Sequence, residues 1–422
     1  MDAVAAPLSA PPAPRGVIRR LQSRQGREDP FPLFEEIRQV GPVVSLGRHA
    51  LLVTGYKECA HILSDRIWQV PDQQWRTARG VHTDGSSIGV MATLPRLNPP
   101  VHSRLRHLLA APFTQRALTL MLPTVRDLVH HHLDTLEAEL RQHGRAEFMS
   151  TVARALPVAV MCAILGLPAK DMPLIAHYSI QTAPLTEPFA TPAQITAADE
   201  AAGQFHAYIM ALMTAPGPHP GDGLLTRWRT ETHPARDTTS NGDLAANVVF
   251  LLGAGVETTS SLFATALTAL ERHPRQAAWL TTNPQAWPQA VEELMRWDPS
   301  VHNAVRFPAQ DTVLAGIEVP AGTLVHALIA AANRDPEHFP APHDLDFHRP
   351  PKRSLAFGAG PHYCLGAPLA RLNALELLPE LLRRFPTLRT DGPAVRAAGI
   401  NLRTVITLPV SHRPSQPTIP HP

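Results

Sequence analysis

A glycine-rich loop that carries one cysteine and runs straight into a helical pattern most constrains what this chain can fold into. The stretch reads Ser354-Leu-Ala-Phe-Gly-Ala-Gly-Pro-His-Tyr-Cys364-Leu-Gly-Ala-Pro-Leu-Ala-Arg371. Gly358 and Gly360 permit backbone turns that a side chain would hinder, so the loop can close tightly around Cys364. The helix expected after it would point its N-terminal N–H groups at the sulfur, which favours a thiolate over a thiol.

A thiolate in this setting is suited to binding a soft or borderline metal. One cysteine cannot build a structural zinc site, which needs about four ligands, whereas one thiolate is enough for iron held in a large planar cofactor. For Cys364 alone, a buried structural cysteine beside a tight turn is the more common explanation. Phe357, His362 and Gly366, at their offsets from Cys364, favour the iron ligand instead.

A long segment without proline predicts the central helix of the molecule. It runs from Asp243, the expected cap, to about Arg272, which corresponds to roughly 45 Å of helix. Its centre, Gly253-Ala-Gly-Val-Glu-Thr-Thr-Ser-Ser261, is a poor helix sequence. Each glycine costs about 1 kcal/mol relative to alanine, and the hydroxyl groups compete for backbone carbonyls. Such a weak patch indicates a local distortion with a purpose.

Two residues of that patch have the chemistry of a proton-handling site. Thr258 can hydrogen-bond the carbonyl of Ala254 and so open a groove in the helix, and Glu257 is an acid in an otherwise apolar stretch. A close contact between helices through small residues would also explain the patch.

Two shorter patterns concern charged side chains on helices. His102 and Arg106 follow Asn98-Pro-Pro, lie four residues apart on one helical face and could hold an anion, although a solvated basic face is the commoner explanation. Glu293 and Arg296 lie three residues apart and can form an ion pair, which most often is a surface pair.

Periodic and alternating patterns predict the remaining framework. Prolines break the helical pattern between residues 178 and 196, and residues 64–91 form a long irregular segment. We expect helices near residues 29–38, 56–63, 124–140, 148–165 and 198–213, and two antiparallel strands at 42–46 and 50–54.

These motifs together resemble those of the cytochromes P450. Phe357-Gly-x-Gly-x-His-x-Cys-x-Gly366 is similar to the haem-binding loop of that family, and Ala254-Gly-x-Glu-Thr-Thr259 is similar to its acid–alcohol motif. Glu293-x-x-Arg296 resembles the family's ExxR motif, with Arg349 as the candidate third member of its buried network. The resemblance covers roughly residues 25–412 and departs from the family pattern at Asn98, Ser354, Pro361 and Pro379.

The resemblance implies a mainly α fold with a small β part, in which a long central helix and the cysteine loop enclose haem. We expect residues 1–20 to form a disordered Ala/Pro-rich lead-in and residues 21–422 to form a single domain. Asn98 departs from the family's Asp at a local helix cap, where the two residues serve about equally well. Pro379 should kink the last helix or end it early.

The resemblance also assigns roles to residues. Cys364 would ligate the iron, Thr258 would hydrogen-bond the bound oxygen, and Glu257 would relay protons to it. The implied haem contacts are His102, Arg106, Arg306 and His362 around the propionates, together with Phe357, Gly366 and Ala254. Candidate residues of the substrate pocket are Trp68, Trp75, Ile88, Phe250, Gly253, His302 and Ile400, besides Ala254. The broken segment 178–196 would correspond to the family's mobile lid.

The implied activity is that of a soluble bacterial monooxygenase that inserts one oxygen atom from O₂ into a lipophilic substrate, by hydroxylation or epoxidation, in natural-product tailoring. It would use haem b, with electrons from NAD(P)H through a ferredoxin reductase and a ferredoxin that docks near Cys364. Oxidative coupling, ring formation or nitration are alternatives. A non-catalytic recruitment domain is another, but such a domain should lack the thiolate or the acid–alcohol pair, and both are present.

Composition narrows the partners and the compartment. Charged residues make up 18% of the chain with a net charge of +2 and no basic block, so nucleic acid is not an expected partner. Three widely spaced cysteines give no disulfide framework, which favours the cytoplasm. We expect no secretion signal in residues 1–16, no membrane span, because no uncharged apolar run approaches about 18 residues, and a monomer.

Overall fold

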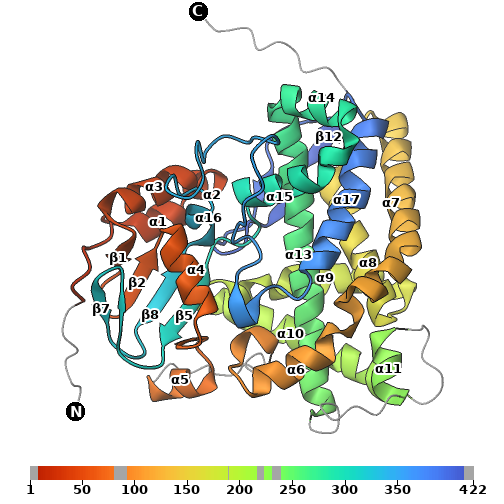
Figure 1. Ribbon diagram of the computed structural model, residues 1–422. Coiled ribbons are helices and arrows are strands. Elements are labelled where there is room, and N and C mark those ends of the chain that lie inside the picture. Colours follow the sequence, from red (N-terminus) through yellow and green to blue (C-terminus); the bar gives the residue numbers. More distant parts are fainter. Residues whose placement is uncertain (1–7, 80–92, 189, 216–222, 231–238, 413–422) are drawn as a thin grey trace, which may run out of the picture.

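The computed structural model describes residues 8–79, 93–188, 190–215, 223–230 and 239–412. Helices built around α13 (Asn241–Arg272) form the larger part of the protein, and a small mixed sheet with its own helices lies beside them (Figure 1). The expected combination of many helices with a small β part is confirmed.

Helix α13 is the central element of the helical part. Its cap is Ser240 rather than Asp243, because the Ser240 hydroxyl accepts the Asp243 N–H at 3.0 Å. The helix contacts α8 (Ala155–Leu165), α9 (Met172–Thr182) and α10 (Pro192–Thr214). By length and composition α13 could cross a membrane, but 72% of its most apolar window is buried inside the protein.

Helix α17 (Ala367–Arg384) follows the cysteine loop and runs beside α13 (Figure 1). It also packs on α7 (Gln115–His143) and α15 (Trp287–Trp297). Pro379 lies inside α17 without ending it early, so that part of the expectation is wrong. Leu377, Leu378 and Leu381 are buried on either side of the proline, and this packing compensates for the lost backbone hydrogen bond.

The sheet-rich part contains five strands in the order β1-β2-β8-β5-β3. Only β2 and β8 are parallel, with Ala50 opposite Leu324, and β1 and β2 form the expected antiparallel pair. The strands are β1 (Val43–Ser45), β2 (Ala50–Val53), β3 (Trp68–Gln69), β5 (Ala304–Pro308) and β8 (Leu324–Ala327).

Side chains of β2 are buried on both faces of the sheet, because they alternate between the two faces along the strand. Leu52 packs with Phe34 and Ile37 of α3 (Phe31–Val40), while Leu51 and Val53 pack with residues of α4 (Tyr56–Ser64) on the opposite face. Successive strand residues point to opposite faces, which is why one short apolar strand can serve two helices.

The expected disordered lead-in is wrong for residues 8–20. Ala13 donates its N–H to the Ser45 carbonyl at 2.8 Å, Ser45 donates back to Pro11 at 2.7 Å, and α1 begins at Val17. A sheet edge supplies the partners that this Ala/Pro-rich segment cannot provide for itself.

Asn98 does not cap α6 (Val101–Ala110), whose N-cap residue is Pro100 without a side-chain cap. Its amide instead accepts from the Val70 N–H at 3.0 Å and donates to Asp72 at 2.9 Å. Asn98 therefore ties α6 to the segment before α5.

Short elements complete the framework. The irregular segment after residue 64 contains β3 and α5, and the break after α9 consists of the 3₁₀ turn η6 (Ala183–Thr186) before α10. The segment expected as a helix at 148–165 begins with a π-helical turn, η4 (Met149–Ala153). The others are α2 (Arg24–Glu28), α5 (Gln73–Ala78), α11 (Leu224–Thr230), α14 (Pro274–Thr282), α16 (Ile329–Ala332), β4 (Arg145–Glu147), β6 (Thr312–Leu314), β7 (Ile317–Val319), β9 (Arg389–Thr390), β10 (Val395–Arg396), β11 (Val405–Thr407) and β12 (Pro409–Ser411).

Candidate active site

The cysteine loop adopts the tight turn that its glycines predict. Gly358 and Gly360 have φ of 69° and 65°, in the left-handed region that favours glycine. A Cβ on Gly360 would lie 2.4 Å from the Leu63 carbonyl oxygen, so α4 also requires a glycine there. The Cys364 N–H donates to the Phe357 carbonyl at 2.9 Å and closes the loop.

Cys364 is exposed, unlike Cys59 and Cys162, which are buried. Burial raises the pKa of its thiol, while the N–H groups of Gly366 and Ala367 and the guanidinium of Arg106 act in the opposite direction. The start of α17 therefore does point its backbone N–H groups at the sulfur, as predicted.

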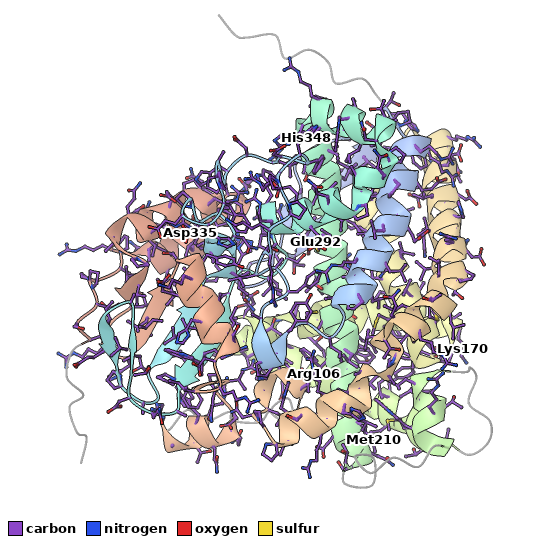
Figure 2. The ribbon with its side chains drawn as sticks, in the orientation of Figure 1. Arg106, Lys170, Met210, Glu292, Asp335 and His348 are labelled. Atoms are coloured by element: carbon purple, nitrogen blue, oxygen red, sulfur yellow. The ribbon has the colours of Figure 1, made fainter. Side chains whose placement is uncertain are left out.

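Four nitrogen-bearing side chains gather near this loop from three elements. The rings of His102 (α6) and His362 (loop) have centroids 4.1 Å apart. Arg106, on α6 (Figure 2), donates to the Tyr363 carbonyl at 2.8 Å. Arg306 comes from β5 and is buried.

These four groups disfavour each other's charge. Burial, with Arg106 and Arg306, lowers the pKa of His102 to about 4. Burial and the same neighbours hold the pKa of His362 well below its usual range, and burial lowers that of Arg306 to about 10. Both ring nitrogens of His102 are buried without a hydrogen-bond partner. Orphaned donors and mutual repulsion are what an anion-binding site shows before an anion neutralises it.

The weak patch of α13 has two structural explanations, one for each kind of residue in it. The Thr258 hydroxyl donates to the Ala254 carbonyl at 2.7 Å, as predicted, and so diverts a helix carbonyl. Gly255 serves a close contact, because a Cβ on it would lie 3.3 Å from Met161 Sδ, whereas a Cβ on Gly253 would make an ordinary contact at 3.5 Å from Thr182 Oγ1. Gly253 thus faces α9.

Glu257 has a partner that the sequence analysis missed. Arg154, next to α8, places its Nε 3.5 Å from Glu257 Oε1, and its Nη2 donates to the Val405 carbonyl at 2.9 Å. Burial raises the pKa of Glu257, and Arg154 partly opposes that rise. Arg154 is the one charged residue in the apolar segment 148–165, and that isolation was the available signal.

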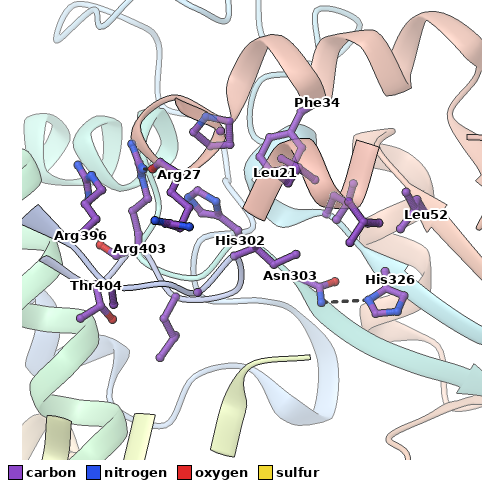
Figure 3. A pocket seen from close by; sticks show the side chains of 18 residues that line it. Leu21, Arg27, Phe34, Leu52, His302, Asn303, His326, Arg396, Arg403 and Thr404 are labelled. Atoms are coloured by element: carbon purple, nitrogen blue, oxygen red, sulfur yellow. Dashed lines mark hydrogen bonds between the residues drawn. The ribbon is translucent and has the colours of Figure 1, made fainter. Parts of the chain in front are cut away.

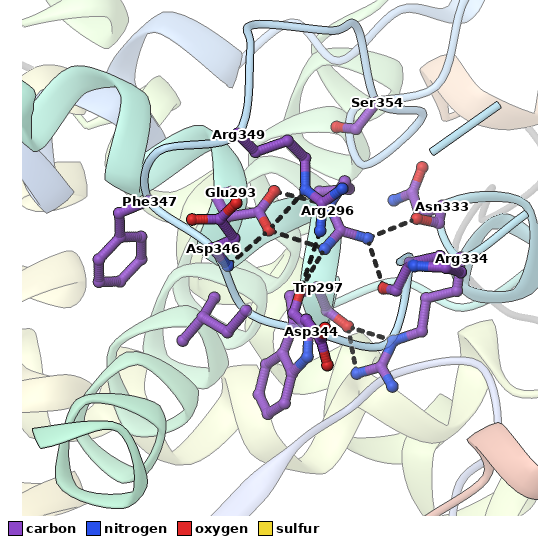
Figure 4. A network of polar contacts seen from close by, with 12 residues as sticks. Glu293, Arg296, Trp297, Asn333, Arg334, Asp344, Asp346, Phe347, Arg349 and Ser354 are labelled. Atoms are coloured by element: carbon purple, nitrogen blue, oxygen red, sulfur yellow. Dashed lines mark hydrogen bonds and ion pairs between the residues drawn. The ribbon is translucent and has the colours of Figure 1, made fainter. Parts of the chain in front are cut away.

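The Glu293–Arg296 pair is buried rather than superficial (Figure 4). Arg296 donates to both carboxylate oxygens of Glu293 at 2.6 and 2.7 Å and to the carbonyls of Asn333, Pro342 and Asp344. Arg349 Nε binds Glu293 Oε1 at 3.0 Å, which confirms it as the third member.

Three of the predicted pocket residues pack against neighbouring elements as follows. Trp68 is buried in the core of the sheet-rich part, and Trp75 donates its indole N–H to the Gly322 carbonyl at 3.2 Å. His302 packs against Phe31 and Phe34, with centroids 6.1 and 5.8 Å away. Trp68 takes the core face of β3, and sequence position alone cannot say which face of a strand a side chain takes.

The other predicted pocket residues are placed as follows. Ile400 and His302 line a pocket between the N-terminal helices, the sheet and the loop before β11 (Figure 3). Arg403 anchors that pocket by donating to Asp298 at 3.1 Å and to the Glu28 carbonyl at 2.9 Å. Phe250 is half-buried on α13, and Ile88 falls outside the described residues.

The side chains around Cys364 suit a metal ion whose other ligands come from a cofactor. In the described ranges, no group of three or more His, Cys, Asp or Glu residues could hold a metal ion. Cys364 offers one sulfur, and the unpaired cationic groups near it suit the carboxylates of a planar iron cofactor. These residues fit haem.

The comparisons with known proteins agree with this site. A family model described as cytochrome P450 matches residues 287–395. The chain is 33% identical over 394 residues to cytochrome P450 monooxygenase PikC of Streptomyces venezuelae, covering 91% of each chain. It is 32% identical over 388 residues to mycinamicin IV hydroxylase/epoxidase of Micromonospora griseorubida, covering 89% of this chain and 94% of the relative.

The fold is similar as well. The ligand-free crystal structure of Mycobacterium smegmatis CYP164A2 matches with a TM-score of 0.84 and 31% identity, covering 94% of this chain and 99% of the other. Nearly full-length similarity, together with a cysteine loop that faces a cationic cluster, shows that the chain belongs to the cytochrome P450 family.

Proposed function

We propose that this protein is a haem-thiolate monooxygenase that inserts one oxygen atom from O₂ into a lipophilic organic substrate, by hydroxylation or epoxidation. The observation that carries the proposal is the convergence of the Cys364 loop with four cationic or donor side chains that lack an acidic partner among the described contacts. The name of a relative that is a hydroxylase/epoxidase supports both reaction types. Tailoring of a bacterial natural product is the role that such names favour.

Each residue near the loop has a proposed task. Cys364 holds the iron, while His102, Arg106, Arg306 and His362 bind the two carboxylates by charge-assisted hydrogen bonds. Phe357, Gly366 and Ala254 are further residues that we expect would contact the haem. When bound, the haem supplies the activation of O₂ and the transfer of one oxygen atom.

Glu257 and Thr258 handle protons on α13. The Thr258 hydroxyl donates its single hydrogen to the Ala254 carbonyl, so its oxygen can accept a hydrogen bond here, and it can donate elsewhere only when that bond is broken. Glu257 is buried with both carboxylate oxygens lacking a hydrogen bond, so it can take up and release a proton without breaking one. Arg154 acts to lower the pKa of Glu257 and so favours its charged form.

The proposed monooxygenase activity also requires redox partners. Electrons from NAD(P)H arrive through a ferredoxin reductase and a ferredoxin, which docks near Cys364, where Arg104 and Arg353 are exposed. We propose haem b as the cofactor, residues 21–422 as one domain, a monomeric state and a cytoplasmic location. The free state of Cys59, Cys162 and Cys364 supports the last point.

Oxygen-isotope incorporation tests the proposal. Lipophilic natural products, beginning with mycinamicin IV, are screened for a change in the haem spectrum and then incubated with ferredoxin, its reductase, NADPH and ¹⁸O₂. We expect a product that contains one ¹⁸O atom. A product without ¹⁸O would contradict oxygen insertion and favour oxidative coupling or ring formation.

A further inference from the structure

Glu187 binds a loop that lies more than two hundred residues away in the sequence. Its Oε2 accepts the N–H groups of Ile400 and Asn401 at 2.9 and 3.0 Å, and its Oε1 accepts that of Leu402 at 2.9 Å. Asn401 donates its side-chain N–H in return to the Thr186 carbonyl at 3.0 Å. Three consecutive backbone N–H groups thus enclose one carboxylate, and hydrogen bonds to a charged acceptor are the stronger kind.

Gly399 makes this contact possible. A Cβ at that position would lie 2.3 Å from Glu187 Oε1 and 2.4 Å from its carboxyl carbon. No side chain fits at position 399 without displacing the carboxylate, so the contact requires both the glycine and the glutamate. We call the contact between Glu187 and residues 399–402 the clasp.

The clasp joins the break between α9 and α10 to the wall of a pocket. Glu187 follows η6, in the break between α9 and α10, and residues 399–402 form part of the wall of the pocket in Figure 3. Arg96 donates to the Leu185 carbonyl at 3.2 Å and holds the same break from its other side. Glu187, together with the hydrogen bond from Asn401 to Thr186, therefore ties the break to the pocket wall.

From the loop, backbone contacts continue to α13. His302 donates its N–H to the Asn401 carbonyl at 2.8 Å, and Arg403 donates its N–H to the Ser300 carbonyl at 2.9 Å. The Ser300 hydroxyl then donates to the Thr258 carbonyl at 2.7 Å. The position of Glu187 is thus connected to the residue that is proposed to handle protons.

We propose that Glu187 is a positioning residue whose carboxylate clasps residues 399–402, and that release of the clasp is the step that lets organic ligands pass between the α9–α10 break and the pocket wall. The inference rests on the proposed function for its meaning in catalysis. Loss of three charge-assisted bonds should weaken the closed arrangement by about tenfold or more. Ligands that must pass the clasp then leave faster by a similar factor.

Ligand release measures the clasp in the haem-loaded protein. The probe is 4-phenylimidazole, whose binding to haem changes the absorption spectrum, and its dissociation rate is followed by stopped flow. We expect Glu187→Ala and Gly399→Ala each to raise that rate about tenfold, and Glu187→Gln to raise it less because one amide oxygen can still accept. Glu200→Gln removes an exposed acid of α10 and should leave the rate unchanged.

Two further readouts separate positioning from folding. The double variant Glu187→Ala/Gly399→Ala should release the probe no faster than either single variant, because both remove the same contact. Hydrogen exchange at the amides of residues 400–402 should quicken in Glu187→Ala and stay unchanged in Glu200→Gln. This exchange measurement does not require haem, so it tests the clasp even where the proposed function fails.

The outcomes are decisive in each direction. Unchanged exchange at residues 400–402, or an unchanged dissociation rate in both single variants, would overturn the clasp. Additive effects in the double variant would mean that the two residues act separately. Loss of the reduced CO spectrum in Glu187→Ala would assign Glu187 to folding instead.

Discussion

Glu257 is buried beside a single cation, and this pairing determines its chemistry. Burial raises its pKa, while Arg154, at 3.5 Å, restrains the rise without forming a hydrogen bond. A carboxyl held between these two influences can exchange a proton near neutral pH more readily than an exposed glutamate.

Removal of the Thr258 hydroxyl should separate electron use from product formation. In Thr258→Ala the donor at this point of α13 is lost, so we expect product formation to fall by roughly 10²-fold, the lower end for a positioned proton donor. NADPH oxidation should continue. The ratio of product to NADPH consumed is the measurement, Thr258→Ser is the control that keeps the hydroxyl, and unchanged coupling in Thr258→Ala would exclude this role.

Arg154 should set the pH range in which Glu257 works. Because Arg154 now lowers the pKa of Glu257, Arg154→Leu should raise that pKa further, and Arg154→Lys should preserve it more closely. The inflection in the pH–rate profile that disappears in Glu257→Gln should therefore move to higher pH in Arg154→Leu. An inflection that stays in place would show that the two residues are not coupled.

The sequence predicted residue chemistry well where a motif fixes both the residue and its neighbours. Thr258 and the Glu293–Arg296 pair have the contacts that their spacing suggested, and Arg349 joins that pair as the family resemblance implied. Arg154 was missed because its partner lies about a hundred residues away on another helix, and no local pattern records that packing.

At the scale of elements, buried charge is tolerated only where every donor is used. Arg296, on α15, is almost fully buried, and it makes five hydrogen bonds to Glu293 and to three carbonyls of the segment after α16. The arginine thus holds a segment without regular structure against a helix, which supports the cysteine loop that follows.

Glu293→Gln should destabilise the protein strongly. It leaves Arg296 with an unpaired buried charge, and breaking one partner of a buried pair costs about 3–5 kcal/mol in the free energy of unfolding. Arg383→Gln breaks the exposed Glu380–Arg383 pair, which has the same spacing, and should change stability little. Chemical denaturation of the two variants makes the comparison, and equal effects would contradict the buried network.

Elements themselves were predicted better than their ends. Apolar periodicity placed α3, α4, α7 and α13, whereas the caps were misassigned, with Ser240 in place of Asp243 and Pro100 in place of Asn98. Ser240 and Asp243 are equally good caps by residue type, and Asn98 found stronger partners in Val70 and Asp72. Tertiary contacts decided the second case.

At the scale of the whole molecule, Arg403 joins the two ends of the described chain. Its guanidinium pairs with Asp298 and also donates to the carbonyls of Arg27 and Glu28, near the N-terminal helices. Burial alone would raise the pKa of Asp298, but Arg403 and His302 outweigh it and hold that pKa far below its usual range.

The stability that Arg403 provides should depend on pH in a defined direction. A carboxyl with a depressed folded-state pKa contributes stability above its unfolded value, near 3.9, and loses it as the pH falls further. Arg403→Leu should therefore cost about 3–5 kcal/mol at pH 7, as for a broken buried pair, and less below about pH 4. Denaturation curves at both pH values check this, and a cost that does not change with pH would contradict the pairing.

Long-range arrangement was the least predictable level. Residues 8–20 were expected to be disordered because their composition offers little apolar surface, yet the edge at Ser45 orders them. Trp68 was expected in the substrate pocket, and it packs in the core of the sheet-rich part instead. Both outcomes depend on partners that become neighbours only after folding.

The absorption spectrum of the reduced, CO-bound protein tests the haem-thiolate site most directly. We predict a thiolate-shifted Soret band in the natural protein and in Cys162→Ala, a control at another cysteine, and its loss in Cys364→Ser. Absence of the shifted band in the natural protein, or its persistence in Cys364→Ser, would contradict the assignment of Cys364 as the iron ligand.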